Sequence, residues 1–226
     1  MEFQTLNSVK LFRPSLIRDE IYTLLRNELI SGHLRPHQTL RVQDLADSLE
    51  VSKTPIHDAL NRLVKDGLVE SLNRGFRVKR FTKKEALDTY QVRERLEGLS
   101  ASLAAQNHNE ADLEELEHIL STIESCPPSD FVSHIQADLE LHDTIARIAN
   151  NDALKLSIAQ LSNRMLGFRV VTKDENSNLI TKEQHEKVIR AIAAGDAKGA
   201  EQAMTEHIRF FADLLSQRLE GATYVA

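Results

Sequence analysis

The sequence has no tryptophan, only one cysteine and few aromatic residues of any kind. Aromatic side chains account for 5% of its 226 residues, and it holds eight glycines and five prolines. That supply of turn-forming residues is too small for an all-β protein with many short strands. The single cysteine, Cys126, excludes an internal disulfide and is typical of a reducing compartment.

Long apolar runs are also missing. No stretch approaches the roughly 18 uninterrupted apolar residues that a membrane-spanning helix needs. A basic N-terminus followed by an apolar segment, which would indicate a secretory signal, is absent as well. We therefore expect a soluble cytoplasmic protein without a membrane partner. Its length allows one large or two modest domains, and 41% hydrophobic residues with few aromatics favour helices.

The charge is unevenly distributed along the chain, although its net value is −6. Residues 1–80 hold 13 Lys and Arg against 10 Asp and Glu, a net charge of +3. Residues 81–226 hold 15 against 24, a net charge of −9. A mildly basic unit followed by an acidic one is typical of a DNA reader with an attached second domain.

Residues 42–79 predict two short helices, a tight turn between them and a β-hairpin. Apolar residues recur at helical spacing in both helices: Val42, Leu45, Ala46 and Leu49, then Ile56, Ala59, Leu60, Leu63 and Val64. Ser52 is placed to cap the second helix, and Pro55 falls in its first turn, where a missing N–H costs little. Apolar segments around Asn73-Arg74-Gly75 predict two strands and a turn. This is the arrangement of a winged helix-turn-helix, whose second helix enters the major groove of DNA.

These residues carry a family resemblance. LADSLEVSKTPIHDALNRLVKDGLVES, followed by NRGFRV, resembles the winged helix-turn-helix of GntR-type bacterial transcription regulators, over about residues 15–80. The family usually has Gly at Glu50 and Arg at both Lys53 and His57. Lys and His cannot make the forked contact of Arg to guanine, so the resemblance supports DNA binding better than it supports the family's usual operator.

The DNA contacts are expected on the polar side of this region. The candidates are Gln43, Lys53, Thr54, His57, Arg62, Arg74 and Gly75. Arg62 has an alternative as an ion-pair partner of Asp58 or Asp66, and Arg74 as a solvated turn residue. One winged domain with so little excess charge would bind weakly, so we expect a homodimer on double-stranded operator DNA with an inverted repeat.

After residue 81 the pattern changes to long helices. Six are expected, over about residues 82–107, 110–123, 129–148, 152–171, 179–194 and 196–219, with a polar loop over residues 172–178. The expected fold is mainly α: a winged helix-turn-helix domain over residues 1–80, then an all-α antiparallel bundle over residues 81–226.

Within the bundle, Asp138 and His142 lie four residues apart, so one helix face presents both. His185 and His207 lie on two further predicted helices. One carboxylate and three imidazoles suit Zn²⁺, Ni²⁺ or Mn²⁺, although ordinary Asp–His surface pairs have the same spacing.

The same four residues, in the same order, resemble the motifs of the FCD domain. That is the helical effector domain of the fatty-acid-regulator branch of GntR proteins. The resemblance implies that Asp138, His142, His185 and His207 coordinate a divalent metal ion, and that Arg93 binds a small carboxylate effector. Arg93 could instead be a surface partner of Glu97. His134, Arg164 and Arg169 are further candidates for the pocket.

The expected function is a DNA-binding transcription regulator, most often a repressor in this family, that responds to a small organic acid at the metal site. It is not expected to be an enzyme. The alternatives are a metalloenzyme that uses the Asp-His₃ site, and a constitutive DNA-binding protein with a purely structural metal.

Overall fold

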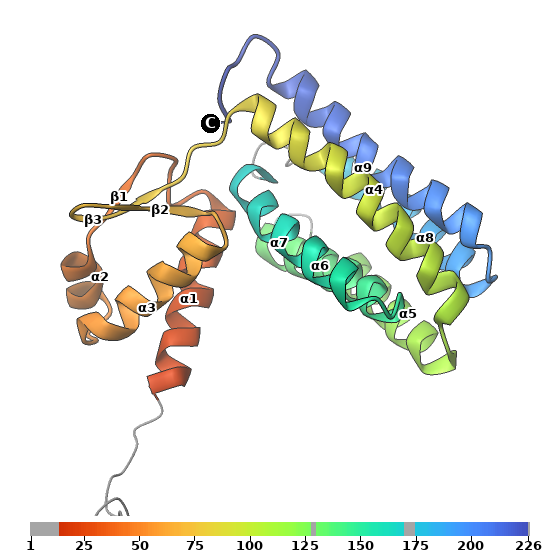
Figure 1. Ribbon diagram of the computed structural model, residues 1–226, viewed down its shortest axis with the longest axis horizontal. Coiled ribbons are helices and arrows are strands. Elements are labelled where there is room, and N and C mark those ends of the chain that lie inside the picture. The colour runs from red at the N-terminus through yellow and green to blue at the C-terminus, as the bar shows by residue number, and fades with distance from the viewer. Residues whose placement is uncertain (1–13, 128–129, 170–174, 226) are drawn as a thin grey trace, which may run out of the picture.

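The computed structural model describes residues 14–127, 130–169 and 175–225. In Figure 1 a small α/β group lies beside a larger bundle of helices, and a single extended connection joins them. This confirms the expected fold class, mainly α with an N-terminal winged helix-turn-helix and a C-terminal bundle. None of the described helices is long and apolar enough to cross a membrane.

The N-terminal group follows the predicted order of elements. Its elements are α1 (Pro14–Ser31), β1 (Thr39–Leu40), α2 (Val42–Ser48), α3 (Lys53–Lys65), β2 (Val69–Leu72) and β3 (Gly75–Val78). The three strands form an antiparallel sheet in the order β1-β3-β2, and Thr39 pairs with Arg77. The strand β1 was not predicted, because two residues are too few to show alternation.

One local expectation in this group needs correction. Ser52 occupies the position before α3, but its side chain makes no capping hydrogen bond. In α1, the apolar residues Leu16, Ile17 and Leu24 are exposed. Helical spacing marks an apolar stripe without showing how much of the helix a core covers.

The bundle consists of α4 (Lys83–Asn107), α5 (Glu110–Ser125), α6 (Phe131–Ile148), α7 (Asp152–Arg169), α8 (Glu175–Ala193) and α9 (Ala197–Arg218). Side-chain caps start five of them, at Thr82, Asn109, Asp130, Asn151 and Asp196. The predicted loop was wrong over residues 175–178, which form the first turn of α8; residues 172–174 lie outside the described part. Polar composition alone does not distinguish a solvated helix turn from a loop.

Helix α4 turns its polar residues inward and several of its apolar residues outward. Arg93, Glu97 and Ser100 are buried, whereas Val92 and Leu99 are 50% and 45% exposed. Val92 and Leu99 are therefore not part of the apolar core. A functional cluster, described below, occupies the inner face instead.

The two groups share packing at their junction. Ile135 of α6 and Leu166 of α7 are buried in the apolar core of the N-terminal group. Asp66, at the end of α3, accepts hydrogen bonds from Tyr22 (2.8 Å) and from Asn163 of α7 (3.1 Å). The chain returns to this junction at its C-terminal end, where Val225 N–H donates to the Phe81 carbonyl (Figure 1).

Candidate nucleic-acid interface and candidate metal centre

The outer side of the helix-turn-helix presents a shallow groove between α2 and α3. Its lining residues are Val42, Lys53, Thr54, His57 and Asp58. Lys53, Thr54 and His57 are exposed at the N-terminal end of α3 and were expected to contact DNA. Asp58 was not on that candidate list, although it lies in the same groove. A carboxylate there can accept from the amino group of cytosine.

Two of the expected DNA-contacting side chains already have neighbours on their own helix. His57 Nδ1 lies 2.8 Å from Asn61 Nδ2, and its ring meets the edge of Phe76. Gln43 donates to Asp47 at 2.6 Å. Both side chains are exposed, so these contacts orient them on the surface without burying them.

Arg62 lies against α1 and not at the groove. Its guanidinium forms an ion pair with Asp19 (Nη1–Oδ1 3.2 Å) and stacks 3.8 Å above the centre of the Tyr22 ring. Neither Asp58 nor Asp66, the two expected alternative partners, is the partner found. This ion pair competes with a contact between Arg62 and DNA.

The wing has an exposed tip. Arg74 is exposed, and Gly75 has a φ of 106°, which glycine adopts without strain. A Cβ at Gly75 would lie 3.3 Å from the Leu40 carbonyl, so β1 also restricts this position to a small residue.

The four candidate metal ligands come together inside the bundle. Asp138 and His142 of α6, His185 of α8 and His207 of α9 each offer one ligand atom, and these atoms all lie within 4.8 Å of one another. All four residues are buried. His185 Nε2 and His142 Nε2 lie 3.2 and 3.7 Å from Asp138 Oδ1.

Neighbouring side chains set the orientation of two of the imidazoles. His207 Nδ1 lies 3.1 Å from Gln184 Oε1, which can only accept, so Nδ1 carries the proton and Nε2 keeps its lone pair. His142 Nδ1 contacts the Glu97 carboxylate, which leaves Nε2 facing Asp138. Partners of this kind on the second ring nitrogen are usual for metal-binding histidines.

Glu97 is itself held by Arg93. The Arg93 Nε donates to Glu97 Oε1, and both side chains are about 2% exposed. Burial opposes ionisation of Glu97, but the charges of Arg93 and His142 outweigh it and lower the pKa of Glu97 to about 2. The surface pair expected as an alternative for Arg93 is thus a buried pair on the inner face of α4.

The residues present fit a divalent ion. Burial, together with His185 and His142, holds the pKa of His207 well below its usual value, which favours the neutral imidazole that metals bind. Bond lengths of about 2.0–2.2 Å place donors on opposite sides of an ion at most about 4.4 Å apart. The ligand atoms of the cluster lie within 4.8 Å of one another, a few tenths of an ångström more than that separation.

Two buried donors on α4 have no hydrogen-bond partner within the described part of the chain: Arg93 Nη2 and Ser100 Oγ. Glu97 lies four residues after Arg93 and three residues before Ser100, so all three residues lie on one face of the helix. Buried donors left unsatisfied in a native structure need an explanation, such as a water or a ligand.

The other pocket candidates lie elsewhere. His134 is half-buried and outside the four-residue cluster. The side chain of Arg164 packs against Gly67, where a Cβ would meet its Cγ at 3.3 Å, so it belongs to the junction with the N-terminal group. The side chain of Arg169 lies outside the described residues.

Glu97 and Gln184 were missed as partners of the histidines by the sequence interpretation. A sequence signal for Glu97 did exist, because helical spacing places Arg93, Glu97 and Ser100 on the same face as Tyr90 and Ala104, which are buried. Gln184 precedes His185 on α8 but bonds to His207 on α9, so only the packing of the two helices shows its role.

A winged helix-turn-helix joined to a helical bundle defines the class of the protein as a two-domain DNA-binding regulator. The family described as bacterial regulatory proteins of the gntR family matches residues 17–88, and the FCD domain matches residues 88–210. The chain belongs to the GntR family of transcriptional regulators and carries an FCD domain, which confirms the resemblance seen in its sequence.

Similar proteins have regulatory names. The HTH-type transcriptional regulator LutR of Bacillus subtilis is 30% identical over 84% of this chain and 97% of its own length. The HTH-type transcriptional repressor GlaR of Escherichia coli is 27% identical over 88% and 96%. The Nta operon transcriptional regulator of Aminobacter aminovorans is 26% identical over 85% and 91%. These relatives are transcriptional regulators, consistent with a protein that is not an enzyme.

Solved structures share the fold. E. coli McbR/YncC superposes with a TM-score of 0.77 at 24% identity, over 89% of this chain and 98% of that chain. A GntR transcriptional regulator from Rhodococcus sp. RHA1 superposes with a TM-score of 0.72 at 23% identity, over 90% and 97%.

Proposed function

We propose that this GntR-family regulator binds an inverted-repeat operator as a homodimer, and that a small carboxylate bound beside a metal ion in the bundle changes its affinity for DNA. The observation that carries the proposal is the buried group of Asp138, His142, His185 and His207 next to unsatisfied donors on α4. Repression is the expected sign of regulation.

The DNA-contacting residues of the proposal lie at the groove and at the wing tip. Lys53, Thr54, His57 and Asp58 line the groove, and exposed Gln43 lies on the neighbouring helix α2. Arg74 beside Gly75 suits the minor groove, where a narrow width attracts guanidinium groups. The ion pair of Arg62 with Asp19 competes with a contact of Arg62 to DNA.

The outer face of α4 is the proposed dimer interface. Val92, Leu96, Leu99 and Leu103 are spaced by four, three and four residues, the repeat of helices that pack in pairs. Leu96 and Leu103 also pack against Leu154 and Ile158 of the adjacent helix α7, whose Leu156 is 66% exposed. A second copy of the chain can cover this face by two-fold symmetry.

The charges of the cluster favour an anionic effector. Arg93 contributes one positive charge, and Glu97 and Asp138 contribute one negative charge each. When bound, a divalent ion supplies two further positive charges and leaves a net charge of +1 for a small monoanion to neutralise. Arg93 Nη2 and Ser100 Oγ are the donors available to its oxygens.

Helix α6 connects this cluster with the DNA reader. It carries Asp138 and His142, and one turn before them Ile135 is buried in the core of the N-terminal group. Gln136 of the same helix donates to Asn27 of α1 at 3.0 Å. A shift of α6 on ligand binding would therefore move the reader, whose two copies must match about one turn of DNA.

The test is operator affinity measured by fluorescence anisotropy, on metal-loaded protein, with and without each member of a panel of small carboxylates. We expect at least one acid to change the affinity several-fold. Arg93→Gln should abolish that change, whereas Arg95→Gln, an exposed arginine on the same helix, should keep it. Equal affinities across the panel would contradict the proposal and favour a purely structural metal.

A further inference from the structure

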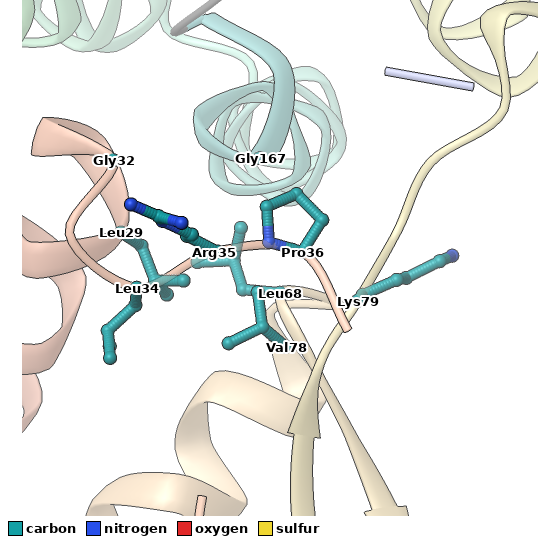
Figure 2. A pocket seen from close by; sticks show the side chains of 9 residues that line it. All are labelled: Leu29, Gly32, Leu34, Arg35, Pro36, Leu68, Val78, Lys79 and Gly167. Carbon is teal, nitrogen blue, oxygen red and sulfur yellow. The ribbon is translucent and has the colours of Figure 1, made fainter. Parts of the chain in front are cut away.

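A cavity of 190 Å³ lies at the junction of the N-terminal group, which is the DNA reader, and the bundle, away from the metal cluster. Its walls come from the end of α1, the connection to β1, the sheet and α7 (Figure 2). The lining residues are Leu29, Gly32, Leu34, Arg35, Pro36, Leu68, Val78, Lys79 and Gly167. At about 30 Å³ per water, it has room for about six water molecules, or for one small organic molecule.

The lining combines apolar walls with positive charge, and none of the lining residues is acidic. Arg35 and Lys79 extend toward opposite sides of the cavity (Figure 2). Lys79 forms an ion pair with Glu85 at 3.3 Å. The guanidinium of Arg35 forms no hydrogen bond or ion pair with any side chain among residues 14–127, 130–169 and 175–225.

The wall that carries Arg35 is held in place before any ligand binds. Arg35 N–H donates to Gln38 Oε1 at 2.9 Å, and Gln38 N–H donates to the Arg35 carbonyl at 3.0 Å. His37 N–H donates to the Val78 carbonyl at 3.0 Å and ties the connection to the sheet. A preformed wall reduces the ordering cost of binding.

We propose that this cavity binds a small monocarboxylate with a compact apolar body, about the size of benzoate. The carboxylate pairs with Arg35, whose fork can make two charge-assisted hydrogen bonds. The apolar body packs against Pro36, Leu68 and Val78. The volume is below the range of about 300–1,000 Å³ usual for drug-sized ligands, which limits the occupant to a molecule of this size.

Because of the position of the cavity, such a ligand could change how the two domains are oriented relative to each other. Gly167 lines it, Leu166 is buried in the core of the reader, and Phe168 is buried in the core of the bundle. A Cβ at Gly167 would clash with the ring of Phe81, so the backbone of α7 lies in direct contact with the connection between the domains. A ligand in the cavity could thus affect the position of the DNA-binding N-terminal group, independently of a ligand at the metal cluster.

The experiment is a titration of the full-length, metal-loaded protein with benzoate, followed by NMR of its leucine and valine methyl groups. Benzyl alcohol serves as the uncharged probe of the same shape. We expect saturable shifts at Leu29, Leu34, Leu68 and Val78, weakened about tenfold in Arg35→Gln, the loss expected when one charged contact of about 1.4 kcal/mol is removed. Arg95→Gln, at an exposed site on α4, should bind as the wild type does.

Three results would overturn the proposal. The first is an absence of saturable shifts at the cavity methyls. The second is equal binding of benzoate and benzyl alcohol, or equal binding by Arg35→Gln and wild type. The third is a response confined to Leu141, which precedes His142 in the chain, and Val188, one helical turn after His185; it would place benzoate at the metal cluster. Because Arg35 is exposed, its replacement should not affect folding.

Discussion

Arg93, Glu97 and His142 form a chain of buried contacts in which each side chain holds the next. Arg93 pairs with Glu97, and Glu97 contacts the Nδ1 of His142. Removing one member of a buried ion pair leaves the other charge unpaired, which costs far more than the loss of a surface pair. Glu97 therefore affects both the stability of the bundle and the orientation of a metal-binding imidazole.

Replacing Glu97 with glutamine should weaken metal binding about 10- to 100-fold, the usual effect of removing a carboxylate behind a metal-binding histidine. The unpaired Arg93 should lower the free energy of unfolding by about 3–5 kcal/mol. Isothermal titration calorimetry and urea denaturation measure the two effects. Glu94→Gln is the matched control, because Glu94 lies on the same helix as Glu97 but pairs with Arg209 of α9, which is half exposed. Similar losses in both variants would show that Glu97 has no special role.

Glu50 has a φ of 54° at the turn between α2 and α3. A side chain in this left-handed conformation is strained, and glycine is not. The chain therefore carries a small destabilisation at this turn.

Glu50→Gly should raise the free energy of unfolding by about 1 kcal/mol, because it removes this strain. Glu50→Ala is the control, since it removes the carboxylate but keeps a Cβ in the same conformation. Thermal denaturation of both variants measures the effect. If the alanine variant is stabilised to the same degree, the gain in stability comes from loss of the carboxylate and not from relief of backbone strain.

At the scale of elements, α4 is organised by function as well as by core packing. Its inner face carries Arg93, Glu97 and Ser100, and Val92 and Leu99 are left to the outside. A helix that buried only its apolar residues would be rotated away from the cluster.

Leu99→Glu should convert the proposed dimer into a monomer, because it places a charge in an apolar interface. Operator affinity should then fall by at least tenfold, since one reader makes half of the contacts. Ile180→Glu is the control: Ile180 is 41% exposed, close to the 45% of Leu99, but lies on α8. Sedimentation velocity measures the oligomeric state, and a dimeric Leu99→Glu variant would place the interface elsewhere.

The contact between α1 and the end of α3 predicts a pH dependence. Burial and the hydrogen bond to Asp66 raise the pKa of Tyr22 to about 12 from its usual value of 10. The folded state thus holds the phenol proton more tightly than the unfolded chain does. This contribution to stability is fully present below pH 10 and is lost as the pH rises toward 12.

In Tyr22→Phe this pH dependence should disappear. The difference in unfolding free energy between the wild type and the variant should stay constant below pH 10 and move against the wild type above it. Urea denaturation over pH 8–12 measures that difference, and absorbance of the tyrosinate follows the titration. A constant difference over the whole range would show that the pKa of Tyr22 is unshifted.

At the scale of the whole molecule, metal binding should be linked to folding, because the four proposed ligands come from three helices that meet only in the folded bundle. A free ion concentration 100 times the dissociation constant should raise the free energy of unfolding by about 2.7 kcal/mol. Chelation should reverse this gain.

Zn²⁺, Ni²⁺ and Mn²⁺ are the ions to compare in that experiment. His207→Ala should abolish the stabilisation, and His118→Ala should retain it because His118 is exposed on α5. Thermal denaturation with and without chelator provides the measurement. An identical response of the two variants would indicate that the ion binds at another site.

The sequence by itself determined the class of the fold and the order of the elements apart from β1, and its resemblance to the FCD domain indicated the four residues of the cluster. Helical spacing, capping residues and the Asn73-Arg74-Gly75 turn act through neighbours in the chain, so their effects can be predicted from local order. Asp138 and His142 were predicted to share a helix face because four residues span one turn.

Only the tertiary structure decided which way the faces point and which residues meet across helices. The inward rotation of α4, the Glu97 contact to His142, the Gln184 contact to His207 and the pairing of Arg62 with Asp19 depend on residues far apart in the chain. The cavity beside Arg35 likewise exists only because α7 packs on the reader. Local periodicity is the same for a helix in either rotation, and packing against its neighbours selects one of them.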